Sequence, residues 1–183
     1  IRRFEVEAQL VASVQHPQIV PIFDYWREPD AAYLVTRRFE QGSLRDLIEG
    51  GVMSPEAARR AVTQIGAALA AAHRQGVVHG DVKPSNVLID HEGNAYLADF
   101  GMSLPHSGPG ASDEFIAPEQ AATGEPSPSA DVYSLGALAT SVIGRSGLND
   151  AAADVIAHAT SPLPDDRFPD VETFINALMT ALT

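Results

Sequence analysis

The stretch His79-Gly80-Asp81-Val82-Lys83-Pro84-Ser85-Asn86 is a polar loop followed at once by the apolar run Val87-Leu88-Ile89. A turn over residues 90–94 leads to a second apolar run, Ala95–Ala98, and Asp99-Phe100-Gly101 comes directly after it. Short apolar runs on both sides of a Gly- and Asn-containing turn are typical of a β-hairpin. The sequence therefore predicts a hairpin with a polar loop before its first strand and an Asp-Phe-Gly segment after its second strand.

Three side chains of these segments, Asp81, Asn86 and Asp99, point to phosphoryl transfer. That reaction needs a carboxylate to orient the attacking hydroxyl, and oxygen ligands that hold Mg²⁺ against the phosphates. Taken singly, each residue has a structural explanation, such as an Asp that caps a turn or an Asn that hydrogen-bonds its own loop. Their order and spacing together favour the catalytic interpretation.

The same pattern resembles the protein kinase catalytic loop, H-R-D-x-x-x-x-N followed by D-F-G. Over nearly its whole length the chain is similar to the actinobacterial branch of the bacterial, eukaryotic-like serine/threonine protein kinases. Ala117-Pro118-Glu119 matches the end of the activation segment, and Gln120 is typical of bacterial members. Asp131 resembles the Asp that holds the catalytic loop from the central helix, and Arg167 the late Arg that pairs with Glu119.

The resemblance implies roles for the catalytic residues. Asp81 is the base or orienting group, Lys83 neutralises the transferring phosphate, and Asn86 and Asp99 bind Mg²⁺, with Mn²⁺ as an alternative. Ser112 fits the activation-segment Ser or Thr that contacts the base in Ser/Thr-specific members. The implied reaction is transfer of the ATP γ-phosphate to Ser or Thr hydroxyls of proteins, in signalling.

Nucleotide-binding residues follow from the same resemblance. Thr36 matches the gatekeeper, and the backbone from Arg37 to Phe39 matches the hinge that hydrogen-bonds adenine. Glu7 takes the place of the helix-C Glu that pairs with the strand-3 Lys, and Glu5 is its rival. No Gly-rich loop and no strand-3 Lys precede Glu7, so we expect residues 1–183 alone to be inactive.

The implied fold is α+β and protein-kinase-like, mostly the helical C-lobe with a partial N-lobe. Residues 1–41 form the partial N-lobe, with helix C, strands 4 and 5 and the hinge, and residues 42–183 form the C-lobe. Strands 1–3 are absent. Further domains outside this sequence are expected.

Local signals predict several elements. Runs 19–25 and 32–39 flank a polar turn like a hairpin, and Val77-Val78 reads as a short buried strand. Ser54, Pro55 and Glu56 mark a helix start, and an apolar face follows as far as Gly76. Four more helices are expected over residues 1–14, 130–143, 149–160 and 169–182.

Composition excludes some classes of function. Asp and Glu number 24 against 12 Lys and Arg, a formal charge of −12, which argues against binding to a nucleic-acid backbone. The absence of Cys rules out disulfides and Cys-ligated zinc. No apolar run approaches the roughly 20 residues that span a bilayer, so we expect no membrane segment and a cytoplasmic location.

Two alternatives remain open on the sequence. Gly80 stands where the kinase pattern has Arg, and His-Gly-Asp also resembles the aminoglycoside and choline phosphotransferases, which modify small molecules. Lys83, Glu119 and Arg167 favour protein substrates instead. The second alternative is a pseudokinase-like interaction module without turnover. The short spacing from Asp131 to Arg167 also suggests that a helix usual in the family, often a docking surface, is missing.

Overall fold

The computed structural model describes residues 14–28, 31–51, 53–100, 113–144 and 147–183. These residues contain two small sheets and six α-helices, so the expected α+β class is confirmed. The first helix expected, over residues 1–14, lies almost wholly outside the described residues, as does residue Glu7. None of the described helices is long and apolar enough to cross a membrane.

Each sheet is a two-stranded antiparallel pair: β1 (Ile22–Glu28) with β2 (Ala31–Thr36), and β3 (Val87–Ile89) with β4 (Ala95–Leu97). The segment before β1 is tied to the second sheet, because Val20 N–H donates to Leu97 O at 2.9 Å and Leu97 N–H donates to Gln18 O at 2.8 Å. The two predicted hairpins are therefore connected through β4.

The helices are α2 (Leu44–Glu49), α3 (Pro55–Arg74), α4 (Pro118–Thr123), α5 (Pro128–Ile143), α6 (Asp150–Ala159) and α7 (Val171–Ala181). Short 3₁₀ turns lie at Pro84–Asn86, Asp113–Phe115 and Pro164–Asp166. The predicted start of α3 is confirmed: Ser54 accepts a hydrogen bond from Ala57 N–H and Pro55 is the first helical residue.

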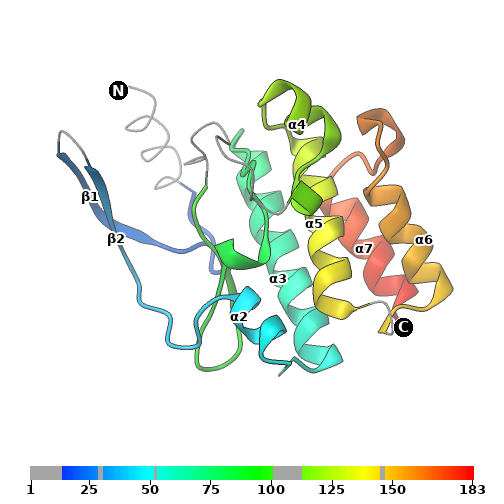
Figure 1. Ribbon diagram of the computed structural model, residues 1–183, viewed down its shortest axis with the longest axis horizontal. Coiled ribbons are helices and arrows are strands. Elements are labelled where there is room, and N and C mark those ends of the chain that lie inside the picture. Colours follow the sequence, from blue (N-terminus) through cyan, green and yellow to red (C-terminus); the bar gives the residue numbers. More distant parts are fainter. Residues whose placement is uncertain (1–13, 29–30, 52, 101–112, 145–146) are drawn as a thin grey trace.

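Helix α3 is the centre of the hydrophobic core, and it packs against α5, α7 and β4. Its face of Val62, Ile65 and Leu69 is completely buried. Figure 1 shows the β1–β2 hairpin at one end of the molecule, α6 at the other, and α3 between them. The loop between α3 and β3, which carries Asp81, begins at the end of this buried helix.

Two local expectations differ from the structure. Val77-Val78 is not a strand, because Val77 N–H bonds back to Ala72 O and closes the end of α3. Helix α4 was not predicted, although Pro118 at its first position and Gly124 at its end are ordinary helix boundary signals.

Candidate active site

The carboxylate of Asp81 is held by its own loop. Lys83 Nζ donates to Asp81 Oδ2 at 2.7 Å, and Asn86 Nδ2 donates to the same oxygen at 3.0 Å and to Asp81 O at 2.8 Å. The 3₁₀ turn Pro84–Asn86 brings Asn86 back toward Asp81. The three residues that the resemblance places in catalysis therefore form one connected group.

A completely buried carboxylate holds the backbone of this loop. Asp131, in the first turn of α5, accepts hydrogen bonds from His79 N–H and Gly80 N–H, both at 2.8 Å. His73 Nε2, at the end of α3, lies 2.8 Å from the same side chain. A carboxylate is favourable at a helix N-terminus, so its place at the start of α5 suits Asp131.

The ring of His79 connects the loop to the residues before Asp99. Its Nδ1 accepts from Asp81 N–H at 3.1 Å, which leaves Nε2–H to donate to Ala98 O at 2.9 Å. Burial lowers the pKa of His79 and outweighs the opposing effects of Asp131 and other carboxylates. The neutral ring packs on Phe100, with 4.6 Å between ring centroids.

Asp99 has a left-handed backbone, with φ of 61°, and it is the one non-glycine residue of positive φ in the described segments. Such conformations cost of order 1–3 kcal/mol and are concentrated at functional sites. Ala98 N–H donates to Asn86 O at 2.9 Å, so Asp99 follows directly after a residue bonded to Asn86. Mg²⁺ prefers oxygen ligands, and Asp99 and Asn86 supply a carboxylate and an amide oxygen.

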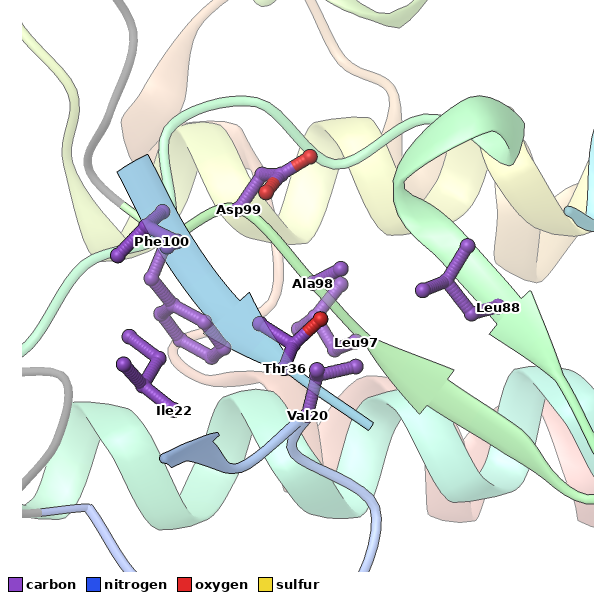
Figure 2. Close-up of a pocket in the computed structure, with 9 residues that line it drawn as sticks. Val20, Ile22, Thr36, Leu88, Leu97, Ala98, Asp99 and Phe100 are labelled. Atoms are coloured by element: carbon purple, nitrogen blue, oxygen red, sulfur yellow. The ribbon is translucent and has the colours of Figure 1, made fainter. Parts of the chain in front are cut away.

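A small apolar cavity of about 90 Å³ lies beside Asp99. Figure 2 shows the lining residues Thr36 and Val20 near the centre of the view, with Leu88, Asp99 and Phe100 around them. These residues come from β2, the segment before β1, β3 and the end of the second hairpin. The predicted gatekeeper Thr36 and the predicted metal ligand Asp99 therefore line the same cavity.

The side chain of Arg37, at the predicted hinge, contacts Phe39 and Tyr96. The sequence did not predict these contacts. The Arg37 guanidinium lies 5.2 Å from the ring centroids of both Phe39 and Tyr96, and Nη1 donates to Tyr96 Oη at 3.3 Å. Asp90, which accepts from Tyr96 Oη at 2.9 Å, is 3.8 Å from Arg37 Nη2. The β3–β4 hairpin thus fixes the segment after β2.

Glu119 and Arg167 form an ion pair at the start of α4. Two nitrogens of the guanidinium bond the two carboxylate oxygens at 2.7 Å each, and the Arg167 side chain is fully buried. This pairing holds the pKa of Glu119 below its usual value. Glu7 and Ser112, the two other predicted site residues, lie outside the described residues.

Comparison with known proteins agrees with this arrangement. The model of the protein kinase domain family matches residues 2–161. Among curated proteins, the chain is 39% identical over 145 residues to the serine/threonine-protein kinase PrkC of Bacillus subtilis, covering 74% of this chain and 22% of PrkC.

Two mycobacterial relatives are similar at the same level. PknL of Mycobacterium tuberculosis is 38% identical over 147 residues, which cover 75% of this chain and 37% of PknL. PknA of the same species is 35% identical over 195 aligned positions, which cover 96% of this chain and 45% of PknA. The chain thus spans less than half the length of these serine/threonine-protein kinases. The fold, the loop that carries Asp81 and these relatives agree. The chain therefore belongs to the protein kinase domain family and is similar to the bacterial serine/threonine kinases.

Proposed function

We propose that the protein is a serine/threonine protein kinase that transfers the γ-phosphate of ATP to Ser and Thr hydroxyls of protein substrates in signalling. The observation that supports this most is the group of Asp81, Lys83 and Asn86, joined by hydrogen bonds of 2.7 to 3.0 Å next to Asp99. A reaction at ATP is also the basis for proposing a cytoplasmic location.

In the proposed reaction, Asp81 orients the acceptor hydroxyl and takes its proton as the oxygen bonds to the γ-phosphorus. The bond from that phosphorus to the bridging oxygen breaks, and ADP leaves. Lys83, already 2.7 Å from Asp81, offsets charge on the phosphoryl group as it passes. Asn86 Oδ1 and the Asp99 carboxylate would hold Mg²⁺, or Mn²⁺, which neutralises phosphate charge when bound.

The nucleotide would lie along the cavity beside Thr36. Its apolar lining, which includes Val20 and Leu88, suits an adenine ring, and the backbone from Arg37 to Phe39 would supply hydrogen bonds. We further propose that residues 1–41 belong to the N-lobe and residues 42–183 to the C-lobe. Glu7 as the helix-C Glu and Ser112 as the activation-segment Ser stay predictions.

The decisive experiment identifies the phosphate acceptor. The full-length protein is incubated with ATP carrying a labelled γ-phosphate and Mg²⁺, with a generic protein, an aminoglycoside or choline as acceptor. We expect label on Ser and Thr of protein and none on the small molecules. Label on a small molecule alone would establish the phosphotransferase alternative, and no transfer with ATP still bound would establish the interaction module.

A further inference from the structure

Gly80, the residue before Asp81, is held by its backbone from two directions. Its N–H donates to Asp131 Oδ1 at 2.8 Å, and its carbonyl oxygen accepts from Gln120 Nε2 at 2.6 Å. Asp131 belongs to α5 and Gln120 to α4, so two helices reach the same residue. Both hydrogen-bonding groups of Gly80 are therefore satisfied by side chains rather than by secondary structure.

The conformation and surroundings of Gly80 are those of a glycine position. Its φ of +73° is a conformation that favours glycine, and a Cβ there would lie 2.6 Å from Pro126 Cβ. A side chain at residue 80 is thus disfavoured by both conformation and packing. The Gly80 carbonyl itself is held by the amide group of Gln120.

Gln120 is suited to hold that carbonyl. Its side chain is buried, with 7% of the residue exposed, and it lies one position after Glu119, which Arg167 binds. The start of α4 is therefore anchored, and burial restricts the amide side chain of Gln120. The distance of 2.6 Å between Gln120 Nε2 and Gly80 O is that of a direct hydrogen bond, with no room for a bridging water.

The contact bears on catalysis because a peptide unit is planar. The carbonyl of Gly80 and the N–H of Asp81 belong to one rigid plane, and that N–H donates to His79 Nδ1 at 3.1 Å. Fixing the carbonyl therefore fixes the plane that contains the N–Cα bond of Asp81, the residue from which the side chain departs. Lys83 and Asn86 then hold its carboxylate from the other side.

We propose that Gln120 is a positioning residue for phosphotransfer: its amide donor holds the Gly80–Asp81 peptide plane so that Asp81 faces the acceptor hydroxyl. The proposal rests on the proposed kinase function. It assigns a role to the N–H₂ group of Gln120 and not to the space that the side chain fills, and this difference can be tested.

The test uses Gln120→Glu and Gln120→Ala in the full-length protein, with Gln75→Ala as control because Gln75 is an exposed glutamine at the end of α3. Gln120→Glu keeps the size of the side chain but places an oxygen against the Gly80 carbonyl. We expect kcat to fall about 10- to 100-fold in both Gln120 variants, because small displacements of reacting groups have effects of this size. The loss in Gln120→Glu should be the larger.

The KM for ATP should stay within about twofold of wild type, because Gln120 does not line the nucleotide cavity. Wild-type kcat in Gln120→Glu, or a loss confined to KM, would overturn the proposal. So would an equal loss in Gln75→Ala. If Gln120→Ala does not fold, the isosteric Gln120→Glu decides by itself.

A second readout does not depend on activity. The amide hydrogens of Gly80 and Asp81, followed by NMR hydrogen exchange, should exchange about five- to tenfold faster in the Gln120 variants, as loss of one hydrogen bond implies. Amides of α7 should be unchanged. If wild type transfers no phosphate, the proposed function fails. The exchange measurement still decides whether Gln120 holds the Gly80–Asp81 peptide plane. Unchanged exchange at residues 80 and 81 would overturn that role.

Discussion

Arg167 binds Glu119 through two parallel hydrogen bonds of 2.7 Å, and its side chain is completely buried. The guanidinium also donates to Ser161 O and Ser129 O, at 2.7 and 3.0 Å, and lies 5.0 Å from the Tyr133 ring centroid. All three guanidinium nitrogens thus donate hydrogen bonds. This arrangement ties the start of α4 to α5 and to the segment before α7.

Removing Arg167 should lower stability strongly. Breaking a buried pair costs about 3 to 5 kcal/mol, because the remaining charge loses its partner. We expect a loss of about 3 kcal/mol in the free energy of unfolding of Arg167→Ala, measured with urea, since the Glu119 side chain is 26% exposed and partly hydrated. The control is Arg74→Ala: Arg74 lies 4.0 Å from Glu172 with both side chains exposed. Exposed pairs contribute about 0 to 1 kcal/mol, and a similar loss in the two variants would contradict the account.

The same pair predicts a dependence of stability on pH. Arg167 lowers the pKa of Glu119 in the folded state below the unfolded value of 4.5. The unfolded chain therefore binds the proton more readily, and the contribution of the pair is complete above that pH and is lost as pH falls through the folded pKa. The stability difference between wild type and Arg167→Ala should therefore shrink as the pH falls through the acidic range in which Glu119 takes up its proton. A constant difference over that range would show that Glu119 does not titrate in the pair.

Gly80→Ala should destabilise the protein more than Gly124→Ala. Both glycines have φ of +73°, but a Cβ at residue 124 meets nothing within 4 Å, whereas one at residue 80 is blocked by Pro126. The left-handed backbone costs an alanine about 1 to 2 kcal/mol at either position. Overpacking should add roughly 1 to 3 kcal/mol at residue 80 alone. Denaturant unfolding of the two variants measures the difference, and equal losses would mean that Pro126 yields easily.

Loss of the Arg37 side-chain contacts with Phe39 and Tyr96 should affect nucleotide binding more than turnover. The Arg37 guanidinium lies 5.2 Å from the Phe39 and Tyr96 ring centroids, and each such contact contributes about 0.5 to 1 kcal/mol. We expect Arg37→Ala to raise the KM for ATP about 3- to 10-fold with kcat nearly unchanged, because the hinge backbone loses its anchor. Arg59→Ala supplies the control, because Arg59 is exposed on α3 and does not line the nucleotide cavity. Equal values of KM in both variants would remove the hinge role from the Arg37 side chain.

Local signals allowed part of this structure to be predicted from the sequence. The start of α3 depends on Ser54 and Pro55 themselves, and the structure agrees there. Val77-Val78 was wrongly predicted as a strand, because hydrophobicity shows burial and not the hydrogen-bond partner: Val77 N–H bonds Ala72 O, and the next loop amides bond Asp131.

Contacts between distant residues were the main omission. The Arg37–Tyr96 contact joins positions 59 apart, and the Gln120–Gly80 contact joins positions 40 apart. Neither leaves a periodic pattern or a spacing in the sequence, so only the folded chain brings them together. The spacing of Asp81, Asn86 and Asp99 could be recognised because a single hairpin carries all three.

The central claim is that Asp81 directs phosphate transfer from ATP, and Asp81→Asn tests it most directly. A positioned general base contributes about 10²- to 10⁴-fold. In the full-length protein we therefore expect kcat for phosphorylation of a protein substrate to fall at least about 100-fold, with ATP affinity retained, because Asp81 does not line the nucleotide cavity. Asp154→Asn, at an exposed position of α6, should leave both quantities unchanged. Near-normal turnover in Asp81→Asn would contradict the account.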